Sequence, residues 1–179
     1  MKRFEYICDA CGKTQNGAPS FSFRFPPYYF DIPETERAER VRVNDDFCEI
    51  DTPEGGTLFW MRVVIEAPIA GATEPFTWGV WVTQSAESFA RYRDTFGQDQ
   101  SADGSFGWLT VDLPCYNRSA AGAVLENLEC DVQWGCTGQR PKAYLWESEH
   151  PLAVDQRGGI SWDRAVEIAT VTNAKFDGC

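Results

Sequence analysis

The sequence has no long apolar run and few basic residues, and each of these two shortages excludes a class of protein. No stretch approaches the roughly 18 consecutive apolar residues of a membrane-spanning helix, so no membrane association is expected. The 16 Lys and Arg residues face 27 Asp and Glu residues, which gives a formal charge of −11. Because phosphate backbones repel such a surface, direct binding of nucleic acid is not expected either.

The chain also lacks the apolar segment that a secretory signal needs after its basic start. We therefore expect a cytoplasmic protein, in which thiols stay reduced. The seven cysteines agree with this, because an odd number cannot all pair within one chain. An apolar share of 43%, of which aromatic residues form a large part, supplies a real core and argues against disorder.

Alternating β-branched and aromatic residues are abundant, and this pattern is typical of strands. The central pair comprises Thr57–Ala67 and 76–83, joined by a loop that contains Pro68, Gly71 and Pro75. Further strands are predicted at 4–8, 20–25, 47–51, 106–113, 128–134 and 142–147, and helices at 32–40, 85–96, 150–157 and 161–172.

Strands follow strands and helices are few, so we predict an α+β protein with a mainly antiparallel sheet and a few short helices packed on it. The length favours a single domain over residues 1–179. Within it we distinguish an N-terminal segment, 1–18, an α+β body, 19–172, and a tail, 173–179, that is expected to be frayed.

The sharpest motif is Cys8-x-x-Cys11, followed by Gly12. Two thiolates at this spacing can bind one metal ion from a tight turn, and glycine after the second thiolate permits that turn. The motif predicts a CxxC knuckle with structural zinc. A closed zinc site needs two further ligands, and the candidates are Cys48, Cys115, Cys130, Cys136 and His150. Inert thiols and a redox-active pair are the alternative interpretations.

Two further residues are singled out. His150, the only histidine, fits a metal ligand, a general base or a structural ring that bonds a backbone group. Trp81 shares a strand face with small and polar residues, so it is a candidate for a shallow ligand pocket or a partner-binding face; the alternative is a position under a helix. The tryptophans of the other predicted strands, Trp60, Trp78, Trp108 and Trp146, are expected in the core.

Short motifs along residues 5–170 occur in a characteristic order. They are CxxCG at 8–12, YYFDIP at 28–33, DFCEID at 46–51, FTWGVWV at 76–82, FGWL at 106–109, RP at 140–141 and HPLA at 150–153. This order resembles the bacterial family called domain of unknown function 2199, whose name carries no activity. The resemblance includes Cys8, Cys11, Cys48 and His150, and it favours Cys48 and His150 over Cys130 and Cys136 as the completing zinc ligands.

These observations predict a zinc-stabilised binding or interaction module rather than an enzyme, and no catalytic residues are assigned. Its acidic surface favours a basic protein partner, through complementary charge. A role like that of an immunity protein or antitoxin would follow from neutralising such a partner. The alternatives are a metal- or thiol-dependent enzyme and a redox-sensing CxxC protein. The oligomeric state is left open.

Overall fold

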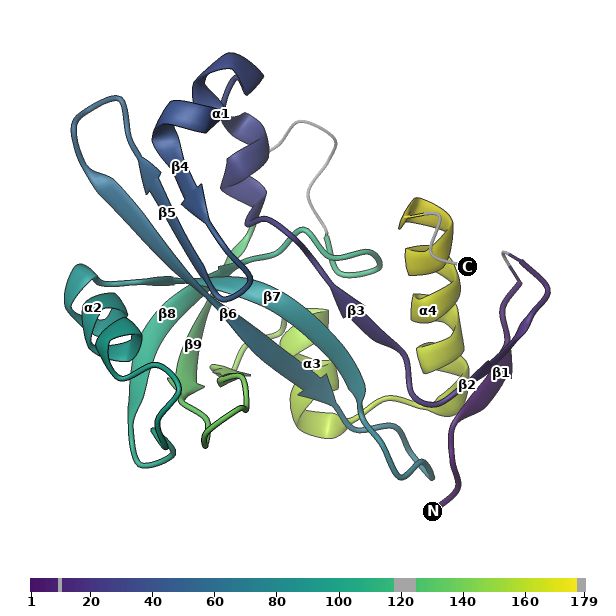
Figure 1. Cartoon of the computed structure of the whole chain (residues 1–179). Helices are drawn as coiled ribbons and strands as arrows, with labels where there is room; N and C mark the ends of the chain where they lie inside the picture. The colour runs from purple at the N-terminus through teal and green to yellow at the C-terminus, as the bar shows by residue number, and fades with distance from the viewer. Residues whose placement is uncertain (10, 118–124, 177–179) are drawn as a thin grey trace.

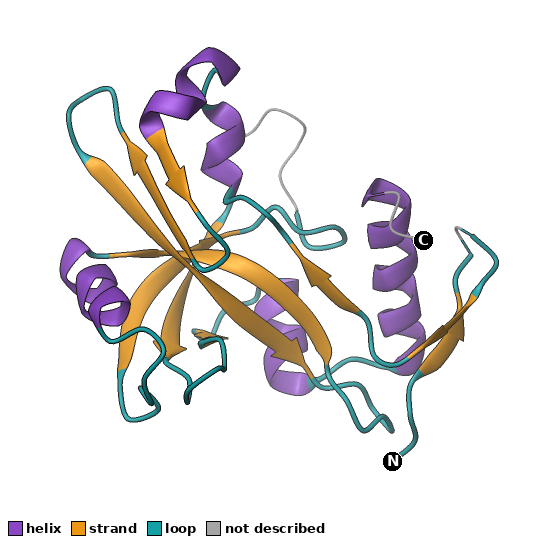
Figure 2. Ribbon diagram, in the orientation of Figure 1, coloured by secondary structure: helices purple, strands orange, loops and turns teal. Residues whose placement is uncertain are grey.

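The computed structural model describes residues 1–9, 11–117 and 125–176, which form mostly sheet with helices at its periphery (Figures 1 and 2). The elements are β1 (Glu5–Ile7), β2 (Thr14–Asn16), β3 (Ser20–Ser22), the 3-10 helix η1 (Pro27–Asp31), α1 (Glu34–Arg40), β4 (Val41–Val43), β5 (Phe47–Asp51), β6 (Thr57–Ala67), β7 (Phe76–Gln84), α2 (Ala86–Asp94), β8 (Gly104–Thr110), β9 (Asn127–Gln133), β10 (Lys142–Leu145), α3 (Pro151–Gly158) and α4 (Trp162–Phe176). The predicted α+β class is confirmed.

Strands β6 to β10 close into a five-stranded barrel, which the sequence did not predict. The central hairpin of β6 and β7 pairs antiparallel over the whole length of β6 from Phe59 onward, and β8 pairs antiparallel along all of β9. Two narrow contacts close the ring. One joins Val82 of β7 to Leu109 of β8, and the other joins Lys142 of β10 to Val64 of β6.

The remaining strands extend this barrel or stand apart from it. Strands β5 and β4 continue the sheet beyond β6, and the short β3 runs parallel to β7. Strands β1 and β2 form a separate hairpin that lies beside α4 (Figure 1). The ring of Phe4 stacks on that of Trp162 with centroids 4.3 Å apart, which fixes the N-terminal hairpin against the helix.

The core divides into two clusters of buried apolar side chains. The larger one fills the barrel and the space beneath α3 and α4, and Trp78 is fully buried in it. The smaller cluster lies between β5, β6 and the region of η1, and its buried members are Ile32, Cys48, Ile50, Trp60 and Trp81. The core predictions for Trp60 and Trp78 are confirmed, whereas those for Trp108 and Trp146 are wrong.

Helix boundaries follow local capping chemistry. Ser85 caps α2 by accepting a hydrogen bond from the amide of Ser88 at 3.1 Å, and Ser161 does the same for the amide of Arg164 at the start of α4. Helix α4 continues to Phe176, and Asn173 near its end is buried. The frayed tail predicted from 173 is therefore wrong up to 176, while 177–179 lie outside the described residues.

None of the helices in the described part of the chain combines the length and the apolar surface that a membrane crossing requires.

Candidate functional site

The outer surface of β8, β9 and β10 carries aromatic and acidic side chains in an ordered pattern. Each of the three strands alternates, with one set of side chains buried in the barrel and the other set directed outward. We call the aromatic and acidic residues of this outward set, together with Trp146 directly after β10, the aromatic–acidic face: Phe106, Trp108, Glu129, Asp131, Tyr144 and Trp146.

Strand register places the carboxylates in a column between two columns of rings. Asp131 of β9 is paired with Phe106 on one side and with Tyr144 on the other. One row along, Glu129 is paired with Trp108, and its carbonyl accepts a hydrogen bond from the amide of Trp146 at 2.9 Å. Each carboxylate thus lies between two aromatic residues from the neighbouring chain segments.

The four aromatic side chains are unusually exposed. Phe106, Trp108, Tyr144 and Trp146 are between 40% and 47% accessible to solvent. The ring of Phe106 meets those of Trp108 and Trp146 at centroid distances of 5.6 and 5.2 Å, with interplanar angles of 86° and 57°. Contiguous exposed aromatic surface is uncommon on a protein that acts alone, and it marks sites of interaction.

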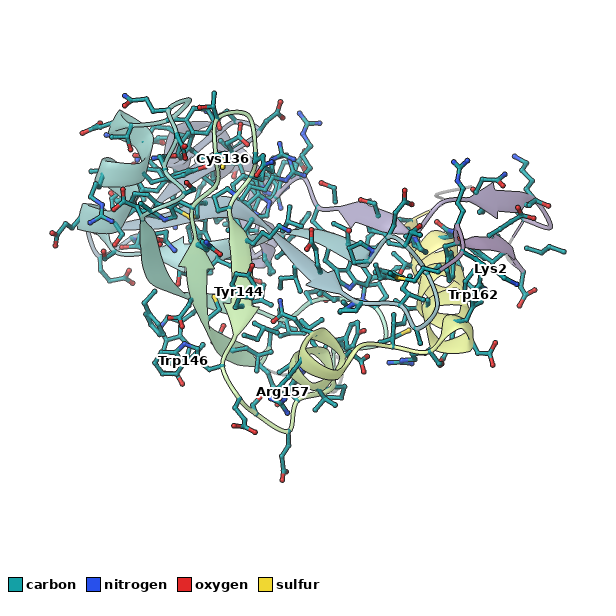
Figure 3. The ribbon with its side chains drawn as sticks, turned by 90° about the horizontal axis from the view of Figure 1, so that it is seen from below. Lys2, Cys136, Tyr144, Trp146, Arg157 and Trp162 are labelled. Atoms are coloured by element: carbon teal, nitrogen blue, oxygen red, sulfur yellow. The ribbon has the colours of Figure 1, made fainter. Side chains whose placement is uncertain are left out.

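Figure 3 shows where this face lies in the molecule. Tyr144 of β10 and Trp146 directly after it lie on the side of the molecule away from Lys2 and Trp162. Helix α3 supports the strand from behind, because the side-chain amide of Gln156 bonds the amide of Leu145 at 2.8 Å and the carbonyl of Ala143 at 2.7 Å. The face is therefore held on rigid elements.

The face is negatively charged. Within residues 1–9, 11–117 and 125–176, no Lys or Arg side chain lies within ion-pair distance of Glu129 or Asp131. Lys142, the first residue of β10 and exposed on the same side, is bound to Glu66 at 2.8 Å. That contact raises the pKa of Lys142 above its ordinary value, so this ammonium is engaged outside the column.

The predicted metal ligands lie elsewhere. Cys8 and Cys11 occupy the turn between β1 and β2, where the amides of Cys11 and Gly12 donate to the carbonyl of Cys8 at 3.3 and 2.7 Å. Gly12 has a φ of +69°, so the tight turn that the motif predicts is present. The Cys8 side chain is fully buried against α4, 3.6 Å from the side-chain amide of Asn173.

The two proposed completing ligands have other surroundings. Cys48 lies in β5 within the smaller core cluster, and burial raises its pKa to about 12, with a further contribution from Glu49. His150 caps α3, because its Nδ1 accepts a hydrogen bond from the amide of Leu152 at 3.1 Å. Its Nε2 lies 3.4 Å from a carboxylate oxygen of Glu126.

Among the described residues, no three His, Cys, Asp or Glu side chains are grouped so that they could hold a metal ion. The predicted set of Cys8, Cys11, Cys48 and His150 is therefore not gathered, and the CxxC turn does not form a closed zinc knuckle. The physical reason is that Cys48 is committed to a core cluster separate from that of Cys8. The side chains do not fit a four-ligand site, and zinc binding stays a prediction.

Trp81 lines a hollow, as one interpretation of its strand face predicted. The hollow is small and lies between the barrel and the segment that leads into η1, with Phe25 and Phe30 in its wall. Trp81 itself is only 2% exposed. Its indole nitrogen donates to the carbonyl of Phe23 at 2.9 Å, so the ring serves the core more than the surface.

Thiol reactivity should follow burial and pKa. Among the cysteines in the described part of the chain, we expect Cys136, which is exposed, to be alkylated first at pH 8, before Cys11 and Cys115. Cys48 and Cys130 should react only on unfolding, because burial raises the pKa of each thiol to about 12 and the thiolate is the reactive form. Mass spectrometry of peptides after timed iodoacetamide labelling measures each cysteine separately.

In that experiment a Cys136→Ser variant serves as the control and should lose the fastest site. Rapid labelling of buried Cys8 together with Cys11 would contradict the expected order and favour the redox alternative. Rapid labelling of Cys48 would instead favour a thiol enzyme.

Sequence reasoning missed the aromatic–acidic face because it assigned Trp108 and Trp146 to the core. The signal was present in the alternation of the strands. Trp108 stands two residues from Phe106 on one face of β8, while Gly107 and Leu109 occupy the other. The alternating acids at 129 and 131 on the next strand mark the same outward surface.

The family model described as "Uncharacterized protein conserved in bacteria (DUF2199)" matches residues 7–160, a range that contains the whole aromatic–acidic face. No curated protein and no solved structure matches the chain. Because the match covers most of the sequence, the chain belongs to this bacterial family, and the resemblance seen in its motifs is confirmed.

Proposed function

We propose that this member of the family is a binding module whose aromatic–acidic face docks a basic segment of a partner protein. The observation that carries the proposal is the column of two carboxylates, Glu129 and Asp131, between two columns of exposed rings. Neither carboxylate has a cation of this chain within ion-pair distance among the described residues.

The two kinds of side chain favour the same ligand for different reasons. A carboxylate attracts a cation and accepts charge-assisted hydrogen bonds from it. The neighbouring rings exclude water, which strengthens that attraction, and their faces attract the same cation. Such pairing of aromatic anchors with complementary charge is typical of specific protein interfaces.

The charge of the face and of the chain disfavours other large ligands. A phosphate backbone would meet Glu129 and Asp131 directly, on a protein whose net charge is −11. A second copy of the same face would bring four carboxylates together. A basic protein instead gains from both the local column and long-range steering. In this proposal the chain acts as a single domain in the cytoplasm, and neutralising a basic protein, as immunity proteins or antitoxins do, is the biological role that follows.

The test uses a defined probe, a fluorescein-labelled 12-residue peptide of alternating lysine and serine, and measures binding by fluorescence anisotropy. We expect Glu129→Gln/Asp131→Asn to weaken binding about tenfold or more, since each lost charge-assisted contact is worth roughly 1.5–3 kcal/mol. The matched control is Glu34→Gln/Glu39→Gln, which removes two exposed carboxylates from α1 and leaves the same net charge.

The control decides between a docking face and diffuse attraction. Binding that falls equally in both double variants would overturn the proposal, because only the net charge would then matter. Binding by neither the wild-type protein nor its variants would overturn it as well. All four substituted carboxylates are at least partly exposed, so thermal unfolding curves should coincide and exclude a folding effect.

A further inference from the structure

We infer that the corner formed by Phe106, Trp108 and Trp146 around Glu129 is an ammonium site, which takes a lysine side chain of the docked segment in preference to arginine. This inference rests on the proposed function and specifies the chemistry of its anchor. Three observations carry it: the angles between the rings, the register position of Glu129 beside Trp108, and the exposure of the three rings.

The ring planes are not parallel. Phe106 stands nearly perpendicular to Trp108, at 86°, and at 57° to Trp146. The three rings therefore form a corner whose walls face in different directions. A compact, nearly spherical ammonium can approach several such walls at once, and groups of this kind recognise lysine and its N-methylated forms.

A guanidinium has different requirements. It is planar, stacks flat on one ring and pairs with a carboxylate through two parallel hydrogen bonds. In this chain, Arg37 lies 4.6 Å from the centroid of Tyr29, whose ring is stacked within 6° of the Phe25 ring. No such parallel pair exists among Phe106, Trp108 and Trp146.

The carboxylate completes the site. Glu129 stands on β9 directly between Trp108 of β8 and the first residue after β10, Trp146. It is partly buried, whereas Asp131 one row along is exposed. A cation at Glu129 therefore gains more from the exclusion of water than one at Asp131, and Glu129 is the anchor of the pair.

The first arm of the test compares matched peptides. The lysine–serine peptide is measured beside an arginine–serine peptide of equal length and charge, and beside a trimethyl-lysine version. We expect the lysine and trimethyl-lysine peptides to bind about threefold to tenfold more tightly than the arginine peptide, which is the range that a cation–π preference supports. Equal or tighter binding of the arginine peptide would overturn the inference.

The second arm tests the site with small molecules that compete for the lysine peptide. Choline carries a trimethylammonium group, and 3,3-dimethylbutanol has the same shape without the charge. Choline should displace the peptide at millimolar concentration and the neutral isostere should not. Equal displacement by both compounds, or by neither, would overturn the ammonium site.

Variants connect the effect to the corner. Trp108→Ala and Trp146→Ala should each abolish competition by choline, whereas Phe30→Ala removes an exposed ring elsewhere, 63% accessible, and should leave it intact. The outcomes separate the two proposals. If basic peptides bind through Glu129 and Asp131 without preferring lysine, the docking function stands and the ammonium site fails. If the carboxylate variants behave like their control, the docking function itself fails.

Discussion

Replacing Gly107 with alanine is expected to lower the free energy of unfolding by about 3 kcal/mol or more, since inserting a methyl group into a packed interior typically costs 1–3 kcal/mol. Gly107 lies in β8 where this strand closes against β7. A Cβ there would overlap a methyl group of Val82, the carbonyl oxygen of Thr83 and the side-chain amide of Gln84. Backbone oxygen cannot rotate away as a side chain can, so the strands must separate.

The effect is steric and not conformational, because Gly107 does not adopt the positive φ that favours glycine. The matched control is Gly158→Ala at the end of α3, where no atom lies within 4 Å of the added Cβ and φ is ordinary. That variant should be unchanged or stabilised by up to about 1 kcal/mol. Urea denaturation measures both. A Gly107→Ala protein as stable as the control would show that β8 does not pack this closely against β7 at Gly107.

Alkaline pH should destabilise the fold by an amount on the order of 5 kcal/mol between pH 8 and pH 11, because each ten-fold shift in a proton equilibrium is worth about 1.4 kcal/mol. Burial raises the pKa of Cys48, Cys130 and Tyr92 to about 12, from ordinary values of 9.0 for the thiols and 10.0 for the phenol. Burial and the neighbouring Asp155 also raise the pKa of Tyr116.

The sign follows from proton binding. Between pH 9 and 12 the folded protein retains protons that the unfolded chain has lost, so stability is complete below about pH 9 and decreases as the pH rises. Urea denaturation at a series of pH values measures the slope. A Cys48→Ala/Cys130→Ala variant should start from lower stability but show a shallower decline. An equally steep decline in that variant would contradict the role of the two thiols.

Local sequence patterns predicted the elements that depend on nearby residues. The hairpin of β6 and β7 follows from alternating apolar residues, and α2 begins where Ser85 offers a cap. The predicted start of the first helix, at residue 32, was less accurate. The chain forms η1 through Asp31, and α1 begins after Pro33 without a side-chain cap. Two prolines nearby permit more than one helical start, and the tertiary contacts of Ile32 decide between them.

Closure of the barrel could not be predicted, because it depends on residues far apart in the sequence. The contact between Lys142 and Val64 carries no local signal, and neither does the close approach at Gly107. The zinc prediction failed to gain support for the same reason. The spacing of Cys8 and Cys11 predicts their turn, whereas the position of Cys48 is decided by which core cluster its strand joins.

The aromatic–acidic face could have been predicted from the sequence, but the usual burial of tryptophan favoured a core position instead. Tryptophan is most often buried, and that average outweighed the alternation that places Trp108 and Trp146 outward. The acids of β9 indicate the correct orientation. A strand face with outward carboxylates is exposed to solvent, and the neighbouring strands expose the same face of the sheet.

The two short ladders that close the barrel are the places where the sheet is expected to open first. Antiparallel ladders hold β5, β6 and β7 together and likewise β8, β9 and β10, while the ladder between the two groups registers only one residue pair at each seam. Opening at those two seams would expose the core that both halves share, but it would not melt either ladder. The surface assigned here to the partner lies wholly within the second half, so thermal fluctuations that part the seams would leave the recognition surface assembled.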